Sequence, residues 1–331
     1  MAELYSVGIT GTGSYVPERV ITNKDLEKLV DTSDEWIVTR TGIRERRIAD
    51  KDVASSDMAT IAAERAIKDA GITAEEIDLI IVSTVTPDMS FPSTACLVQK
   101  NIKAVNAAAF DLEAACSGFI YNLSVASQFI ATGMYRNVLA IGAETLSRFT
   151  NWKDRSTCIL FGDGAGAVVL GRVEKGYGIL SQYLGADGRG GELLACRAGG
   201  SRNPASIETV EKDLHYIYMD GSEVFKFAVR IMVSAAEEAI RRAGMTLDDL
   251  DYLVPHQANI RIIDGAAKRL NLSTDKVWVN LHRLGNMSSA SIPVALDEAV
   301  RSGSIKKGDN LCMVGFGGGL TWGSCIVKWA K

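Results

Sequence analysis

The chain contains an internal repeat, and this repeat restricts its fold more than any other feature of the sequence. Residues 62–81 (AAERAIKDAGITAEEIDLII) and 235–254 (AAEEAIRRAGMTLDDLDYLV) align without a gap, with nine of twenty positions identical. In each copy an amphipathic helix ends at a glycine, Gly71 or Gly244, the usual residue after a helix. A threonine cap, an acidic turn and an apolar strand follow. Because the match continues through all of these, chance similarity between two alanine-rich helices is the weaker explanation.

A second correspondence supports duplication. Cys116 and Asn286 are separated by nearly the same spacing as the two copies, and each opens a helix-like segment that ends near a glycine, Gly133 or Gly303. We therefore expect two similar α/β halves, residues 1–175 with the cysteine and residues 176–331 with a histidine and the asparagine. Alternating helices and buried apolar strands predict mixed, mostly parallel sheets covered by helices. Related halves packed face to face would place equivalent helix N-termini at one central cleft.

Composition excludes several classes of protein. A net charge of -4 gives no overall reason to expect a nucleic-acid partner. No apolar run approaches the ~20 residues of a membrane helix, and the N-terminus lacks the pattern of a signal peptide. The six cysteines are scattered, without a C-x-x-C pair, which favours a reducing cytoplasm over disulfides or a zinc site.

Cys116 is the candidate nucleophile. A strand, residues 107–112, leads into it, and a helix with an apolar face follows. The thiol would then lie at a helix N-terminus, where the helix dipole lowers the pKa of a cysteine. Small neighbours leave room for a substrate. The alternative is a small buried apolar residue, which is what we expect of the other five cysteines: Cys96, Cys158, Cys196, Cys312 and Cys325.

The candidate partners are a histidine and an asparagine. The chain has three histidines, His215, His256 and His282, and His256 directly follows the repeated strand, where α/β folds bind ligands. Its counterpart in the first copy is Ser83, so the second half has gained an ionisable group. A purely structural histidine is the alternative, and we expect His282 at the surface. Asn286 resembles a helix cap; alternatively, its amide donates a hydrogen bond to a thioester carbonyl.

A glycine-rich turn, residues 315–323 (GFGGGLTWG), follows an apolar strand near the C-terminus. Such a turn can cradle a phosphate, but this one lacks the endings of a P-loop or dinucleotide fingerprint. Bare glycine backbone can instead approach an acyl carbonyl and donate an N–H to an oxyanion.

Taken together, these motifs resemble the β-ketoacyl-acyl-carrier-protein synthase III family, thiolase-superfamily condensing enzymes that initiate bacterial fatty acid synthesis. The resemblance covers essentially the whole chain and rests on the Cys116 turn, residues 161–167 (FGDGAGA), residues 255–259 (PHQAN), Gly285-Asn286 and residues 317–319 (GGG). It implies a thiolase-like fold with αβαβα layers and a homodimer. It also implies that acyl-CoA is a substrate and that no cofactor or metal takes part.

The resemblance implies a ping-pong reaction. Cys116 attacks an acyl-CoA and becomes acylated, and malonyl-acyl-carrier protein binds next. His256 and Asn286 hydrogen-bond its thioester carbonyl while CO₂ leaves, and the carbanion attacks the acyl-cysteine. The N–H groups of Cys116 and Gly318 form the oxyanion hole.

Binding residues follow from the same resemblance. Trp36 would stack on the adenine of CoA, with Arg155 on the other face and Arg40 near a phosphate; a core tryptophan and a solvated basic face are the alternatives. The full CoA set is Thr32, Trp36, Arg40, Arg155, Phe225 and Asn259. Acidic carrier proteins suit a local basic patch, for which we expect Gln257, Ala258, Asn259, Ile260, Arg261, Lys226, Lys268 and Arg269.

The resemblance places four residues around the acyl chain: Phe91, Leu146, Phe161 and Phe316. Phe91 would reach this pocket across the dimer interface, and its bulk implies a short primer, acetyl or a small branched acyl group. A long segment, residues 196–215, departs from the family pattern near the expected pocket mouth and leaves primer size and entry open.

Other functions compete with this one. A related condensing enzyme of secondary metabolism fits the same motifs. A type III polyketide synthase shares Cys, His and Asn but is usually longer and takes CoA-bound extenders. A degradative thiolase fits less well because its C-terminal cysteine motif is absent. A non-catalytic protein that binds acyl-CoA or a carrier protein would leave all three residues idle.

Overall fold

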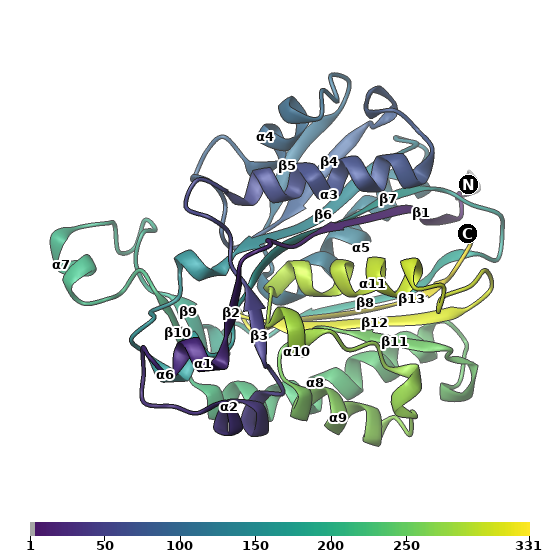
Figure 1. Cartoon of the computed structure of the whole chain (residues 1–331). Coiled ribbons are helices and arrows are strands. Elements are labelled where there is room, and N and C mark those ends of the chain that lie inside the picture. The colour runs from purple at the N-terminus through teal and green to yellow at the C-terminus, as the bar shows by residue number, and fades with distance from the viewer. Residues whose placement is uncertain (1–3) are drawn as a thin grey trace.

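The computed structural model describes residues 4–331 and arranges them in five layers (Figure 1). Helices α3 (Ser55–Ala70) and α4 (Thr94–Asn101) cover the first sheet. That sheet has the order β1 (Val7–Tyr15), β7 (Asp163–Arg172), β6 (Val138–Thr145), β4 (Leu79–Ser83), β5 (Ala108–Leu112). Helices α5 (Gly118–Ala131) and α11 (Ser291–Arg301) fill the middle layer. The second sheet has the order β11 (Tyr252–Pro255), β12 (Asn310–Gly317), β13 (Thr321–Lys328), β8 (Gly178–Ala186), and α8 (Gly221–Arg242) and α9 (Ile260–Arg269) lie beneath it. This confirms the expected α/β layers.

Smaller elements surround this frame. Two small two-stranded sheets pair β2 (Val20–Thr22) with β3 (Glu45–Arg47) and β9 (Leu194–Cys196) with β10 (Ile217–Met219). The short helices are α1 (Asn23–Leu26), α2 (Asp34–Thr41), α6 (Arg155–Cys158), α7 (Ile207–Glu211) and α10 (Leu281–Leu284). The 3-10 turns are η1 (Ala74–Glu76), η2 (Ala115–Ser117), η3 (Leu146–Arg148), η4 (Gly188–Leu193), η5 (Leu247–Asp249), η6 (Thr274–Lys276) and η7 (Ser288–Ala290). Within residues 4–331, no helix has both the length and the apolar character needed to cross a membrane.

The two large sheets are mixed, as expected, but parallel pairs are not in the majority. In the described residues of these sheets, the parallel pairs are β4–β5, β4–β6 and β11–β12. The antiparallel pairs are β1–β7, β6–β7, β12–β13 and β13–β8. The apolar runs in the sequence reflect burial on both faces of each sheet, which the layered packing gives to antiparallel strands as well.

The repeat is present in three dimensions. Gly71 and Gly244 follow α3 and α8 with left-handed φ angles of 70° and 69°, and η1 and η5 begin at equivalent positions, each after a capping threonine. Strand β4 follows α3 and η1 as β11 follows α8 and η5. The counterpart of β5 is reduced to one parallel bridge, between Leu253 and Val277.

The two turns that start the central helices are also copies of each other. Turn η2 precedes α5, and η7 precedes α11, and the spacing between these turns equals that between Gly71 and Gly244. Both contain a non-glycine residue with positive φ, Ala115 at 46° and Ser288 at 45°. The structural counterpart of Cys116 is therefore Ser289, which corrects the expected pairing with Asn286. That pairing aligned the glycines after the two helices, but α11 has 11 residues where α5 has 14.

Candidate active site

Cys116 lies in η2, where the chain leaves β5 and enters α5, and its residue is 8% exposed. The sequence predicts that the helix N-terminus lowers the pKa of its thiol. Instead, burial raises that pKa to about 12; the Ser288 hydroxyl acts in the opposite direction, and the nearby Glu144 carboxylate raises the pKa further. Desolvation thus outweighs the helix dipole, and the resting residue is a thiol.

His256 follows directly after β11 and is buried, 1% exposed. Its backbone N–H donates to Val314 O at 2.8 Å, which extends the pairing with β12. The imidazole lies edge-on to Phe316, with ring centroids 5.6 Å apart. Burial lowers the pKa of His256 to about 3, so the ring is neutral, and its Nδ1 has no hydrogen-bond partner among residues 4–331.

Asn286 is held between Leu160 and the loop that follows it. Its N–H donates to Leu160 O at 2.9 Å, and its carbonyl accepts from Gly162 N at 3.0 Å. The side-chain Oδ1 accepts from Ser288 N at 2.8 Å. The cap interpretation is wrong, because the N-cap residues of η7 and α11 are Met287 and Ala290. The amide Nδ2 makes none of the described hydrogen bonds, and Asn286 lines the second cavity described below.

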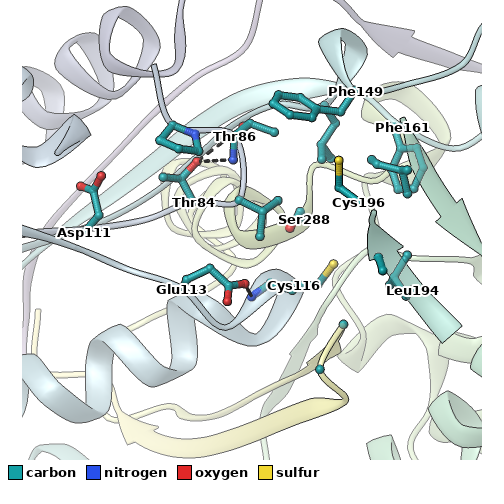
Figure 2. A pocket seen from close by; sticks show the side chains of 18 of the residues that line it. Thr84, Thr86, Asp111, Glu113, Cys116, Phe149, Phe161, Leu194, Cys196 and Ser288 are labelled. Atoms are coloured by element: carbon teal, nitrogen blue, oxygen red, sulfur yellow. Dashed lines mark hydrogen bonds between the residues drawn. The ribbon is translucent and has the colours of Figure 1, made fainter. Parts of the chain in front are cut away.

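Two cavities meet at Cys116. The first, about 640 Å³, is lined by Cys116, Ser288, Leu146, Phe161 and Gly318 among others. Figure 2 shows the Cys116 sulfur pointing into this cavity, with Phe161 and Phe149 across from it. The second, about 500 Å³, is also lined by Cys116 and brings it together with His256, Asn286 and Phe316. The three residues expected to act on substrate therefore converge where the cavities join.

The glycine-rich turn closes on the nucleophile. A Cβ placed on Gly317 would lie 2.5 Å from Cys116 N, so only glycine lets the strand β12 approach the turn this closely. Gly318 lines the first cavity beside Cys116.

The expected acyl-pocket residues divide into three groups. Leu146 and Phe161 line the first cavity, as predicted. Phe316 does not, because β12 directs it toward His256 and the second cavity. Phe91 is 85% exposed and is not among the described residues lining either cavity of its own chain.

The expected CoA residues gather around the second cavity and its approach. The guanidinium carbons of Arg155 and Arg40 lie 5.0 Å and 5.5 Å from the Trp36 ring centroid. The Arg155 guanidinium therefore occupies space that a base stacked on Trp36 would need. The Asn259 side chain caps α9: its Oδ1 accepts from Arg261 N at 2.9 Å, and its Nδ2 donates to Arg40 O at 2.9 Å. Phe225 lines the second cavity, and the guanidinium carbon of Arg261 lies 5.3 Å from the Phe225 ring centroid. The Thr32 hydroxyl is buried without a partner in the described structure.

The expectation that Gln257 contacts a carrier protein is wrong. This residue is fully buried. Its Nε2 donates to Pro255 O and Trp278 O, and its Oε1 accepts from Asn280 N and Leu281 N, at 2.9–3.2 Å. It braces the loop after His256 from inside.

The other residues expected to contact a carrier protein remain accessible in part. Ala258 and Ile260 are half-buried, Arg261 and Lys226 are exposed beside the second cavity, and Lys268 and Arg269 lie at the opposite end of α9. Lys226 is paired with Glu223 at 2.7 Å.

The cysteine expectations hold in part. Cys158, Cys312 and Cys325 are buried, but Cys96 and Cys196 are exposed. Cys196 ends β9 and lines the first cavity (Figure 2), because the 196–215 segment starts at that cavity before it projects outward with α7 (Figure 1). His282 is at the surface, as expected. No local sequence pattern marks Glu144, which reaches the site only through the fold. Ser288 is also missed, although it lies two residues after Asn286 and donates its N–H to the Asn286 side chain.

Comparisons with known proteins agree with this geometry. Family models described as 3-oxoacyl-[acyl-carrier-protein (ACP)] synthase III and its C-terminal part match residues 110–188 and 240–329. The chain is 64% identical to a β-ketoacyl-[acyl-carrier-protein] synthase III of Caldanaerobacter subterraneus subsp. tengcongensis over 100% of both chains. It is 60% identical to that of Clostridioides difficile over 97% of this chain and 98% of the relative.

Solved structures show the same likeness. The 3-oxoacyl-[acyl-carrier-protein] synthase III of Aquifex aeolicus superposes with a TM-score of 0.91 at 50% identity, covering 98% of this chain and 100% of that one. The priming β-ketosynthase of the R1128 polyketide biosynthetic pathway superposes with a TM-score of 0.91 at 39% identity, covering 99% and 97%.

Proposed function

The chain belongs to the β-ketoacyl-acyl-carrier-protein synthase III family, and on that premise we propose that Cys116, His256 and Asn286 carry out its decarboxylative Claisen condensation. The enzyme joins an acyl-CoA primer to malonyl-acyl-carrier protein and releases 3-oxoacyl-acyl-carrier protein, CoA and CO₂, which initiates fatty acid synthesis. The observation that carries the assignment of residues is their convergence where the two cavities meet.

In the first half-reaction, the Cys116 sulfur attacks the thioester carbonyl of acyl-CoA, and CoA leaves. The acyl chain enters the first cavity beside Leu146 and Phe161. The oxyanion is held by the N–H groups of Cys116 and Gly318, each worth roughly 2.7–4 kcal/mol in the transition state. Gly317 keeps this space clear because it has no side chain.

In the second half-reaction, malonyl-acyl-carrier protein enters through the second cavity. The neutral imidazole of His256 and the Asn286 amide hydrogen-bond the malonyl thioester oxygen, and this stabilises the enolate as CO₂ departs. Loss of CO₂ creates the carbanion without a strong base, which suits a histidine whose pKa is about 3. The carbanion then attacks the acyl-cysteine.

Both substrates approach past a basic rim. Arg40, Arg261 and Lys226 line the second cavity, and they suit CoA phosphates and an acidic carrier protein. An adenine stacked on Trp36 requires Arg155 to move off the ring. Ala258, Asn259 and Ile260 extend this surface, while Lys268 and Arg269 form its outer edge. Gln257 has no part in it.

The remaining features of the proposal concern assembly and setting. We divide the chain into halves 1–175 and 176–331, each built on one large sheet. The exposed Phe91 is assigned to the acyl pocket of a second copy in a homodimer, which closes the first cavity to short primers. The six free cysteines suit a reducing cytoplasm.

A condensing enzyme that primes polyketide synthesis is the second candidate, favoured by the likeness to the R1128 priming ketosynthase. Both candidates are tested by intact-protein mass after mixing with a panel of acyl-CoAs and then with malonyl-acyl-carrier protein. We expect one acyl adduct, absent from Cys116→Ser, that disappears as 3-oxoacyl-acyl-carrier protein forms. Preference for acetyl or short branched primers supports fatty acid initiation. No adduct with any acyl-CoA, or full labelling of Cys116→Ser, would overturn the assignment.

A further inference from the structure

The mechanism above leaves one buried carboxylate beside the nucleophile without a role. Glu144 lies near the end of β6 and is 0% exposed. Five donors of the described chain reach it: the Thr86 hydroxyl at 2.7 Å, the Ser289 hydroxyl at 2.8 Å, and Val85 N, the Thr84 hydroxyl and Ser289 N at 3.2–3.4 Å. No ion pair joins it to a lysine, arginine or histidine within residues 4–331.

The internal repeat shows how Glu144 comes to be there. Val82 pairs with Ile141 in the first sheet as its repeat counterpart Pro255 pairs with Val314 in the second, so Glu144 is the counterpart of Gly317. Around Cys116 this position is bare and leaves the N–H group open to a substrate oxyanion. Around Ser289 the Glu144 carboxylate fills the same place and accepts from the serine instead. The Glu144 carboxylate thus closes the second turn, and it is near enough to the first turn to raise the pKa of the Cys116 thiol.

An unpartnered hydroxyl, that of Ser288, lies near both this carboxylate and the thiol. Ser288 is 2% exposed, and its Oγ has no hydrogen-bond partner among the described residues. It lines the first cavity together with Cys116 (Figure 2). The next residue in the chain, Ser289, donates to Glu144 at 2.8 Å, and the Ser288 side chain lowers the pKa of both the Cys116 thiol and the Glu144 carboxyl.

We propose that Glu144 accepts the proton of the Cys116 thiol, through the Ser288 hydroxyl, when Cys116 attacks acyl-CoA. The S–H bond of Cys116 breaks as its proton passes to Ser288 Oγ, and the proton of Ser288 passes to a Glu144 oxygen. The thiolate forms the new C–S bond, the bond from the acyl carbon to the CoA sulfur breaks, and Glu144 returns the proton to the leaving CoA thiolate. This proposal rests on the function proposed above.

The balance of buried charge supports this route. One negative charge is buried before the transfer, on Glu144, and one after it, on sulfur, so no further charge has to be desolvated. Burial raises the pKa of Glu144 to about 7, with the hydroxyls of Thr86 and Ser289 acting against it, which suits a proton acceptor near neutral pH. His256, with a pKa of about 3, is a poor acceptor. Two other ionisable groups lie around Cys116 and Glu144. Glu113 precedes the η2 turn, and Asp163 on β7 pairs with Thr145, the residue after Glu144.

The test is the single-turnover rate of acyl-enzyme formation from about pH 6 to about pH 9, followed by intact mass. In the wild type, the rate should rise to a plateau with an inflection near pH 7. In Glu144→Gln, the rate at neutral pH should fall on the order of 100-fold, and the inflection should be replaced by a steady rise with pH. Ser288→Ala should lose the plateau in the same way while it keeps the carboxylate. Iodoacetamide labelling of Cys116 should show the same pH profiles without any substrate.

The outcomes separate the possible failures. Asp297→Asn is the control. Asp297 is a buried carboxylate that accepts from the Thr12 and Ser14 hydroxyls, pairs with Arg301 at 2.9 Å and is not among the described residues lining either cavity; this variant should retain the wild-type profile. Once acylated, Glu144→Gln should condense with malonyl-acyl-carrier protein at the wild-type rate. An inflection near pH 7 that persists in Glu144→Gln overturns the proposal. If Glu144→Gln does not fold, the same inflection in Ser288→Ala overturns it. A wild type that forms no acyl-enzyme overturns the proposed function instead.

Discussion

Cys116 and Ser289 occupy equivalent positions in two copies of one turn, one in each half of the chain. The residue before each has the same left-handed conformation, with φ angles of 46° and 45°. The copies differ in what faces them: a bare glycine, Gly317, approaches the cysteine, and a carboxylate, Glu144, approaches the serine. One turn is therefore open to substrate, and the other is closed by the protein itself.

Replacement of the second-substrate residues should separate the two half-reactions. We expect His256→Ala and Asn286→Ala to form the acyl-enzyme but to decarboxylate malonyl-acyl-carrier protein at least about 100-fold more slowly, since each loses a donor to the enolate. Acylation is followed by intact mass, and decarboxylation by release of labelled CO₂. Unchanged condensation in either variant removes that residue from the mechanism.

The buried His256 should make stability depend on pH. Its pKa is about 3 in the folded protein and about 6.5 when unfolded. Below about pH 6.5 the unfolded chain therefore binds a proton at His256 that the folded chain does not bind, and the free energy of unfolding falls as the pH falls. Between pH 7 and pH 5 this contributes a loss of about 2 kcal/mol. The difference in unfolding free energy between wild type and His256→Gln, measured in urea at each pH, isolates this contribution; a difference that does not vary with pH contradicts it.

Removal of the Gln257 side chain should lower stability, whereas removal of the Arg261 side chain should weaken binding of the carrier protein. Gln257→Ala leaves two backbone N–H groups and two carbonyls buried without their partner, so we expect a loss of about 2–5 kcal/mol in unfolding free energy. Arg261→Ala should leave stability within about 0.5 kcal/mol and raise the KM for malonyl-acyl-carrier protein, more strongly at low salt. Equal stability of the two variants would show that Gln257 is not a brace.

The site can be predicted from the sequence to the extent that local patterns mark it. Cys116 and His256 stand where an apolar strand ends, and Asn286 stands just before a helix, so the neighbours of each residue in the chain identify it. Gln257 has the same setting, but hydrogen bonds to residues far along the chain, Asn280 and Leu281 among them, bury it. Glu144 is joined to Ser289 only through the packing of the two halves. The sequence misleads about the pKa of Cys116 for the same reason, because burial is decided by the whole fold.

Phe91 offers a test of primer size that leaves the fold intact. At 85% exposure its side chain packs little within its own chain, so Phe91→Thr should unfold within about 0.5 kcal/mol of wild type. If Phe91 narrows the acyl pocket of a second copy, this variant should accept longer acyl-CoAs, measured as acyl-enzyme formation across a chain-length series. A chain-length profile identical to wild type would rule out Phe91 as a pocket wall.

The closeness of Gly317 to the nucleophile should make a single methyl group costly for chemistry. A Cβ at this position meets Cys116 N at 2.5 Å, Ala115 Cβ at 3.0 Å and Cys116 Cα at 3.2 Å. The first and last of these are backbone atoms, so the turn itself has to shift. Gly317→Ala should displace the Cys116 N–H from the oxyanion and reduce single-turnover acylation on the order of 100-fold or more. Gly188→Ala is the matched control, because a Cβ there meets nothing within 4 Å. Acylation of Gly317→Ala at the rate of Gly188→Ala would show that the turn does not depend on the bare backbone of β12.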